Sequence, residues 1–373
     1  MAIQNKAPLI AVLMLSSCIP LVHIGNAAPE DVAAAPVTVR NLEAVTAKID
    51  PWIAKGYYPG AGLMIVQNGK TVLERYWGGY DQDTVVYIAS AGKWLAAATV
   101  AAVCDEGKLS WDDPVSKWLP EFKDVKGKAT LRQLFAHTSG FPAYHQAPEK
   151  PDAYQTLEEA VAHIAPLPPA AAPGERWEYG GLAMQVGGRM AERAAGKRFE
   201  ELFQEKIARP LGMTHTHFTP VDPGHGHTPM LGGGARSSLH DYSRFLAMIA
   251  NGGVCDGKRV LSENAVQQMQ ADQIGKARVS FPTFPSQIYN AKHTGIYGLG
   301  EWRELEDAHG NALLLSSPSW AGTYPWIDKK NALYGVFIAH VDTHSSAVAK
   351  DKFQAMFESA KLPALVSDFQ IRP

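Results

Sequence analysis

The 373-residue sequence has few of the features that mark several large classes of protein. It holds only three cysteines, and none of them stands in a Cys-x-x-Cys spacing. No stretch gathers five or six like charges, and 35 Lys and Arg nearly balance 37 Asp and Glu, so we expect no nucleic-acid partner. The sequence also lacks the Gly-x-Ser-x-Gly elbow, so the triad of the α/β-hydrolases has no support.

The composition indicates a folded protein with a buried core. Hydrophobic residues make up 46% of the chain and charged residues 19%, which argues against disorder and fibrous repeats. The 33 glycines, 25 prolines and nine tryptophans predict many loops and aromatic-lined surfaces. Hydrolase clefts have such surfaces, but so do binding proteins, so the function has to be inferred from motifs.

The N-terminus resembles an export signal. Lys6 precedes an apolar run over residues 7–21, which is too short to span a bilayer comfortably. We expect a signal peptide at 1–27, cleaved before Ala28, and a periplasmic or secreted protein with no stable membrane span. The alternative is a lipoprotein box that would make Cys18 a lipid anchor. We favour simple cleavage because the residues after Cys18 are still hydrophobic.

Two cysteines remain after removal of the signal. Cys104 lies in an apolar helical stretch, and Cys255 lies in a turn flanked by glycine. They could pair in an oxidising compartment only if the fold brings them together. The spacing favours two unpaired residues, the first acting as a small hydrophobic side chain.

The two ends of the chain predict strands, and the middle predicts helices. Asn68-Gly69 joins two apolar runs, which is a strong signal for a β-hairpin. The expected strands cover 62–66, 71–76, 312–316, 324–327 and 333–340, and the expected helices cover 41–55, 157–164, 182–194, 199–208, 238–250, 263–271 and 345–360.

This order of elements predicts an α+β fold. We expect an antiparallel sheet flanked by helices, built from 39–110 and 294–373, with a mostly helical region at 111–293 and a linker at 28–38. A cleft is expected where the two regions meet, because small-molecule sites often lie at such junctions.

A Ser-x-x-Lys motif stands at the start of an otherwise apolar helix. Lys93 is the only charge between Ile88 and Cys104, so it should lose much of its hydration, and burial favours the neutral amine. Ser90 lies three residues earlier, on the same helical face. The serine would also feel the positive end of the helix dipole. Because a hydroxyl is a weak nucleophile without a base, the pair predicts a Ser90 nucleophile activated by Lys93.

With four later motifs, this pair resembles the serine β-lactamase-related superfamily. The likeness covers about residues 40–360 and is strongest to class C β-lactamase-like carboxylesterases, the family VIII type. It agrees with the fold expected above. The motifs are Ser90-Ala91-Gly92-Lys93, the run 131–141 with His137-Thr138-Ser139-Gly140, the run 173–179 that ends at Tyr179, Arg209-Pro210-Leu211-Gly212-Met213, and the run 232–238 that begins with three glycines.

The resemblance implies a role for three side chains. Ser90 would be the nucleophile, Lys93 its general base or electrostatic partner, and Tyr179 the phenol that relays a proton between Ser90 and the leaving group. A phenol beside a cationic lysine has its anion stabilised, so Tyr179 is also a plausible base on chemical grounds. The sequence leaves open which of the two groups holds the proton at rest.

Two departures from the β-lactamase pattern narrow the substrate. Gly181 stands where these enzymes carry an asparagine that binds the substrate amide. The third family element is best matched by Trp320-Ala321-Gly322, which puts an indole where a cation would hold a β-lactam carboxylate. His293-Thr294-Gly295 is the alternative match, but it precedes Gly298-Leu299-Gly300. With the first match, the backbone N–H groups of Ser90 and Thr323 would form the oxyanion hole.

Aromatic residues near this element are candidates for the substrate pocket. We expect Trp320, Gly322, Tyr324 and Trp302 to contact the acyl or alcohol group, with ordinary core packing as the alternative for the aromatic ones.

Histidines at 215, 217, 225 and 227, with Asp222 between them, have a spacing that zinc ligands use. Their Gly- and Pro-flanked loop favours a segment without a metal, and no metal or organic cofactor is expected.

These observations together predict an exported serine hydrolase that forms an acyl-enzyme at Ser90. Carboxylic esters of small to medium size are the expected substrates. The alternatives are an amidase, D-stereospecific peptidase or β-lactamase of the same fold, and a catalytically silent penicillin-binding-like sensor or binding module. The sequence does not indicate the oligomeric state.

Overall fold

The computed structural model describes residues 36–144, 154–218, 229–280, 282–341 and 357–367. Its central element is a six-stranded antiparallel sheet with the order β2-β1-β11-β10-β9-β8, so strands from the two chain ends lie side by side. The α+β fold expected from the sequence is confirmed. The strands of this sheet are β1 (Gly60–Gln67), β2 (Lys70–Gly78), β8 (Trp302–Glu306), β9 (Ala312–Ser316), β10 (Gly322–Asp328) and β11 (Leu333–His340).

The hairpin of β1 and β2 forms as predicted. Asn68 and Gly69 have φ values of 50° and 73°, which is the left-handed region that a tight hairpin turn needs at both central positions. Alternate residues of β1 then point to opposite faces of the sheet. Leu63 and Ile65 join one hydrophobic cluster, whereas Met64 and Val66 join another. Both faces of the sheet are therefore covered.

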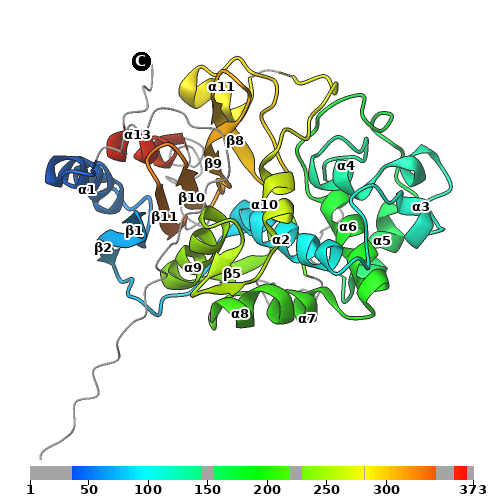
Figure 1. Ribbon diagram of the computed structural model, residues 1–373, viewed down its shortest axis with the longest axis horizontal. Helices are drawn as coiled ribbons and strands as arrows, with labels where there is room; N and C mark the ends of the chain where they lie inside the picture. Colours follow the sequence, from blue (N-terminus) through cyan, green and yellow to red (C-terminus); the bar gives the residue numbers. More distant parts are fainter. Residues whose placement is uncertain (1–35, 145–153, 219–228, 281, 342–356, 368–373) are drawn as a thin grey trace, which may run out of the picture.

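Helices from different parts of the chain cover the two faces. On one face α1 (Val39–Ala54) and α13 (Leu362–Val366) pack together, and on the other α9 (Leu239–Ala250) packs against β1, β10 and β11 (Figure 1). Although α9 falls within the region 111–293, it contacts the sheet directly. The division of the chain into two domains stays a prediction.

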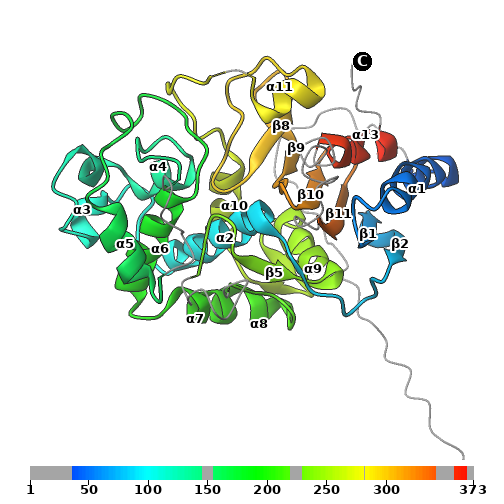
Figure 2. The same ribbon diagram turned by 180° about the vertical axis from the view of Figure 1, so that it is seen from behind.

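The remaining helices lie beside the sheet, with α2 (Gly92–Asp105) running between the two halves of the molecule (Figure 2). This helix is buried on all sides from Gly92 to Val103, as its lack of a polar stripe predicts. The other α-helices are α3 (Val115–Trp118), α4 (Leu131–Phe135), α5 (Leu157–Ile164), α6 (Leu182–Ala195), α7 (Phe199–Phe203), α8 (Arg209–Leu211), α10 (Glu263–Gln270) and α11 (Phe284–Tyr289).

Short strands complete the structure. One small sheet has the order β3-β5-β4 and another pairs β6 with β7. The predicted helix at 345–360 lies mostly outside the described residues, although 357–359 are helical. The signal peptide also lies outside them. The short strands are β3 (Val86–Tyr87), β4 (His217–Phe218), β5 (Ala235–Ser237), β6 (Val254–Cys255) and β7 (Lys258–Arg259).

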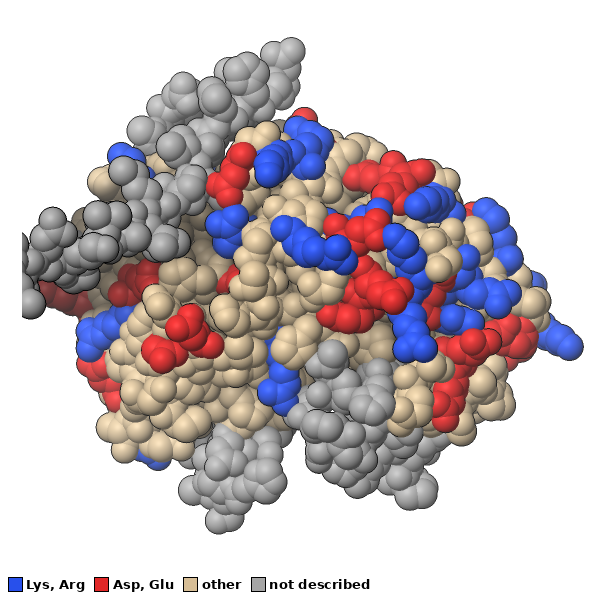
Figure 3. Space-filling model, turned by 90° about the horizontal axis from the view of Figure 1, so that it is seen from below, with Lys and Arg blue, Asp and Glu red and all other residues tan. Residues whose placement is uncertain are grey.

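Three further observations concern the two described cysteines, the length and hydrophobicity of the helices, and the charges on the surface. Cys104 is a free thiol as expected, whereas Cys255 is disulfide-bonded, so the expectation that it is unpaired is wrong. No helix within the described part of the chain is long and apolar enough to cross a membrane. Figure 3 shows one face of the molecule, on which acidic and basic side chains are intermixed, mainly over one half of the view.

Candidate active site

The Ser-x-x-Lys motif lies at the junction of β3 and α2, in the centre of the molecule. Ser90 is in a single 3-10 turn, η1 (Ala89–Ala91), and Lys93 is in the first turn of α2. The Lys93 Nζ is 3.1 Å from the Ser90 Oγ. Both side chains are buried, with Ser90 8% and Lys93 1% exposed. The structure thus brings together the two groups that the sequence predicted to act as a pair.

The turn that carries Ser90 is held from two sides. Ala89 has φ 43°, an unusual conformation for a residue with a side chain, and such strain is common at functional sites. The Ile88 N–H donates to the Ala235 carbonyl of β5 at 3.0 Å. On the other side, the Ser317 hydroxyl donates to the Ser90 carbonyl at 3.1 Å. These bonds fix the backbone of the nucleophile between β5 and the loop before β10.

Burial makes Lys93 a candidate base. It takes part in none of the ion pairs that the described residues form, and its second hydrogen bond goes to the Gly232 carbonyl. With no carboxylate to stabilise the ammonium, desolvation lowers the pKa of Lys93 from 10.5 to about 7. A large fraction of the amine is therefore neutral at physiological pH and able to accept a proton.

Tyr179 completes the group, and its burial bears on the question of which group holds the proton at rest. The Lys93 Nζ lies 4.6 Å from the centroid of the Tyr179 ring, and the Ser90 side chain is close enough to the phenol to lower its pKa. Burial raises the pKa of Tyr179 above 10, although hydrogen bonds from Ser90 and Trp302 lower it in part. Desolvation is the largest contribution to the raised pKa of Tyr179. At rest Tyr179 is a phenol, and Lys93 is the group that more readily loses its proton.

A cage of aromatic rings positions Tyr179. Its ring stacks on Trp302 with centroids 5.4 Å apart and lies 4.7 Å from His137. The His137 Nε2 is 3.2 Å from the Tyr297 hydroxyl, and Trp177 packs 6.0 Å from the Tyr297 ring. Burial, and then the charge of Lys93, keeps the pKa of His137 well below its usual value, so this imidazole is neutral.

The sequence analysis did not predict this cage, although three of its members stand in recognised motifs or beside them. His137 and Trp177 lie in quoted motifs, and Trp302 was expected to contact substrate. The structure buries Trp302, with 7% of its surface exposed, and stacks its ring on that of Tyr179. Contact of Trp302 with substrate stays a prediction.

The Trp320-Ala321-Gly322 segment reaches the site, as the preferred alignment requires. It leads into β10, which contacts η1. Gly322 has φ 109°, and a Cβ there would lie 2.4 Å from the Tyr58 ring, so only glycine fits. The register between β10 and β11 shifts between Gly322 and Tyr324, and at this irregularity the Thr323 hydroxyl donates to the Ala339 carbonyl of β11 at 2.8 Å. Such bulges re-aim backbone groups beside active sites. The oxyanion hole of the Ser90 and Thr323 N–H groups stays a prediction.

The two other aromatic candidates are placed differently. Trp320 is half-buried, and its ring lies 6.2 Å from that of Tyr87, next to the Ser90 turn. Tyr324 is fully buried, and its hydroxyl donates to Glu304 at 2.7 Å. The expectation that Tyr324 lines the pocket is therefore wrong, because its ring has no free face.

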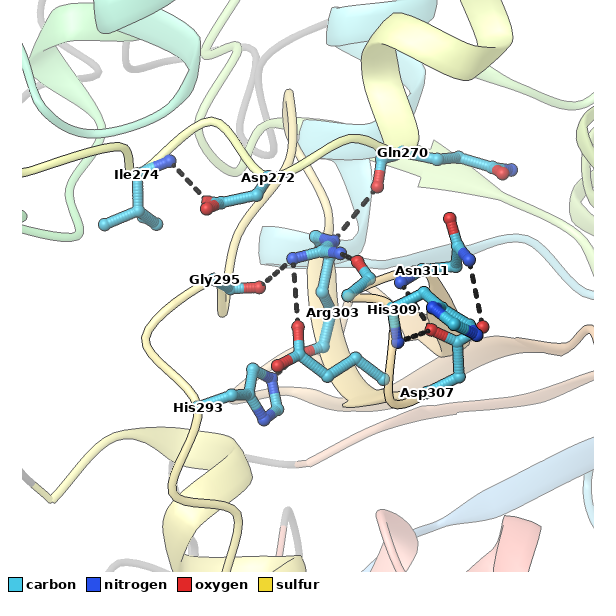
Figure 4. Close-up of polar contacts among 11 residues, drawn as sticks. Gln270, Asp272, Ile274, His293, Gly295, Arg303, Asp307, His309 and Asn311 are labelled. Carbon is cyan, nitrogen blue, oxygen red and sulfur yellow. Dashed lines mark hydrogen bonds and ion pairs between the residues drawn. The ribbon is translucent and has the colours of Figure 1, made fainter.

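The alternative match to the third element, His293-Thr294-Gly295, is hydrogen-bonded to Arg303. The His293 Nε2 lies 3.0 Å from the Arg303 carbonyl, and the Gly295 carbonyl accepts a hydrogen bond from the Arg303 guanidinium (Figure 4). The same guanidinium is bound by the Gln270 carbonyl at 3.1 Å. The loop at 293–295 is thus hydrogen-bonded to Arg303, and none of the hydrogen bonds described for it reaches Ser90 or Lys93.

Among the described residues no cluster of His, Cys, Asp and Glu is arranged to hold a metal. His215 and His217 are described, whereas Asp222, His225 and His227 lie outside the described residues.

Comparison with known proteins agrees with this geometry. The Beta-lactamase family model matches residues 39–357. The chain belongs to the Beta-lactamase family. Its fold is therefore that of a group of serine hydrolases that includes esterases.

Individual relatives carry different descriptions. The chain is 50% identical to a "putative beta-lactamase" from Bacteroides dorei DSM 17855, with a TM-score of 0.83 over 88% of this chain and 98% of that one. It is 29% identical to a "putative D-alanyl-D-alanine carboxypeptidase" of Escherichia coli K12 over 85% of this chain and 86% of that protein. A family VIII carboxylesterase shares the fold. It is 18% identical to this chain, with a TM-score of 0.64 over 88% of this chain and 100% of that one.

Proposed function

We propose that this protein is an exported carboxylic ester hydrolase that forms an acyl-enzyme at Ser90. The observation that carries the proposal is the buried Lys93 amine, 3.1 Å from the Ser90 Oγ and with a pKa lowered to about 7. A neutral amine at this distance can accept the hydroxyl proton as the oxygen attacks. A silent sensor or binding module has no need of this arrangement, since keeping a lysine buried without a carboxylate is costly.

The first half of the reaction acylates the serine. The Ser90 Oγ forms a bond to the ester carbonyl carbon while its proton passes to the Lys93 Nζ, and the carbonyl electrons move onto oxygen. The N–H groups of Ser90 and Thr323 are proposed to bind this oxyanion. When the intermediate collapses, the alkoxide leaves and takes the Tyr179 proton, and the Lys93 ammonium, whose Nζ lies 4.6 Å from the centroid of the Tyr179 ring, returns a proton to the phenolate.

The second half repeats these transfers with water. Lys93, neutral again, accepts a proton from water by way of the Tyr179 hydroxyl as the water oxygen bonds to the acyl carbon. The bond between that carbon and the Ser90 Oγ then breaks, the serine regains the proton, and the acid is released. In both halves Tyr179 acts as a phenol that passes protons, in keeping with the raised pKa of its hydroxyl.

The surroundings of the site support uncharged esters. Trp320 takes the place of a cation, and Gly181 takes the place of an amide side chain, so neither a β-lactam carboxylate nor a peptide amide finds its usual partner. The relatives' descriptions favour two other candidates, a β-lactamase from the Bacteroides dorei protein and a D-alanyl carboxypeptidase from the Escherichia coli protein.

A substrate panel distinguishes these candidates. We expect the purified protein to hydrolyse short-chain aryl esters with kcat/KM at least about a hundredfold above that for a chromogenic cephalosporin or for D-amino-acid amides. The Ser90→Ala variant is the matched control and should lose turnover of every substrate. Inert esters together with turnover of an amide or the cephalosporin would replace the esterase with that alternative.

A further inference from the structure

We propose that the Gly232 carbonyl oxygen is the group that orients Lys93 for proton transfer, and that a backbone contact between Gly181 and Gly232 holds it in place. Gly232 is thus a positioning residue for the reaction at Ser90. The inference rests on the proposed function, in which Lys93 is the base.

The contact with Lys93 is direct. Apart from Ser90, the Gly232 carbonyl is the hydrogen-bond acceptor of the Lys93 Nζ. A neutral amine has two N–H donors and one lone pair. When one N–H donates to a fixed carbonyl, rotation about the last bond of the side chain is restricted, and the lone pair can be directed at the Ser90 hydroxyl. The carbonyl therefore controls the geometry of proton transfer as well as the position of the amine.

The carbonyl belongs to a tight turn with little freedom. The Gly233 N–H donates to the Met230 carbonyl at 3.0 Å, which closes the turn on itself. The Leu231 N–H donates to the Gln185 Oε1 of α6 at 2.8 Å. Beyond the turn the chain continues directly into β5, which braces η1. Gly232 is thus held between the helix that follows Tyr179 and the strand beside Ser90.

Glycine is required at the centre of this turn. A Cβ on Gly232 would lie 2.8 Å from the Gly181 Cα, a distance at which one backbone has to move. On Gly181 a Cβ would meet nothing closer than 3.6 Å, an ordinary van der Waals contact with the Tyr144 ring. The close approach therefore depends on residue 232 having no side chain.

The test replaces Gly232 with alanine and measures kcat and KM, because a misoriented base should lower kcat. The added methyl should push the turn away from Gly181 and move the carbonyl off Lys93. Because misplacement by about 1 Å can cost a hundredfold in rate, we expect kcat to fall at least about tenfold with KM changed less than about twofold. The deficit should persist at pH 9, where the amine is neutral in both proteins, because orientation and not protonation is lost.

Matched controls separate positioning from damage to the fold. Gly233→Ala adds the same methyl one residue later, where the nearest atom is the Tyr87 hydroxyl at 3.6 Å, and should keep kcat within about twofold of wild type. Gln185→Met removes the hydrogen bond to Leu231 without adding bulk at the turn, and should give a partial loss of kcat. If Gly232→Ala does not fold, the test rests on Gln185→Met: a partial loss of kcat supports the role of Gly232, and an unchanged kcat refutes it. Thermal unfolding of each variant identifies a loss of folded protein.

The outcomes also distinguish this inference from the proposed function. Wild-type protein that neither turns over a substrate nor reacts with a fluorophosphonate would refute the serine hydrolase itself. An active wild type whose folded Gly232→Ala variant keeps full kcat, or loses activity through KM alone, would refute only the role of Gly232. A kcat loss in Gly232→Ala that Gly233→Ala does not share supports the proposal.

Discussion

The pH dependence of ester hydrolysis should follow the ionisation of Lys93. An ordinary lysine, with a pKa of 10.5, is neutral in only about 0.03% of molecules at pH 7, whereas burial lowers the pKa of Lys93 to about 7 and makes about half of the molecules neutral. The shift raises the ratio of neutral to charged amine by about three thousandfold, which corresponds to about 5 kcal/mol.

The assay measures kcat/KM for a non-ionising aryl ester between pH 5 and 9.5. Because the amine has to be deprotonated, the rate should rise tenfold per pH unit below the pKa, reach about one tenth of its plateau near pH 6 and level off above about pH 8. Ser90→Ala serves as the blank for spontaneous hydrolysis at each pH.

The variant Lys93→Ala assigns the ionisation. Burial also raises the pKa of Glu304 to about 7, so a midpoint near 7 does not by itself identify the lysine. We expect Lys93→Ala to lose at least about a hundredfold in kcat/KM and to lose the step in its pH profile. A step that remains in this variant, or a wild-type rate that still rises tenfold per pH unit up to pH 9.5, would refute the assignment.

Three further changes test the site and its energetic cost. Tyr179→Phe should lower kcat at least about a hundredfold in the ester assay, and near-normal turnover would exclude the phenol as a proton carrier. Because the pKa of Lys93 is lowered on folding, wild-type stability is reduced below pH 7 and recovers as pH rises towards 10.5. Lys93→Met should therefore be several kcal/mol more stable than wild type in urea unfolding at pH 6, roughly the size of the pKa shift, and the gain should shrink by pH 10. Burial raises the pKa of Glu301 from 4.5 to about 8, so between these pH values the folded state keeps a proton that the unfolded state releases. The stability of wild type should therefore fall relative to that of Glu301→Gln as the pH rises from 4.5 to 8. Stabilities of the two proteins that change with pH in parallel would contradict this.

Much of the fold follows from local sequence signals. The Asn68-Gly69 turn, the strands of its hairpin and the strand Leu333–His340 are specified by turn residues and short apolar runs, and they form where expected. The Ser90 and Lys93 pair was also predictable, because three residues along one helix bring two side chains together whatever the rest of the chain does.

Other parts of the site depend on tertiary structure. Every residue of β10 is buried, so its pattern does not tell which side chains face the core, and Tyr324 was placed at the pocket wrongly. The pKa of Tyr179 is raised mainly by burial, whose extent at this position a sequence does not show. The approach of Gly232 to Gly181 joins segments fifty residues apart, and only the repeated glycines at 180–181 and 232–234 hinted at it.

Covalent labelling with a fluorophosphonate, read by intact mass and peptide mapping at pH 8, tests the central claim most directly. We predict one adduct per chain, located on Ser90, with labelling abolished in Ser90→Ala and slowed at least about a hundredfold in Lys93→Ala. An adduct on another residue, or a Lys93→Ala variant that labels at the wild-type rate, would contradict it.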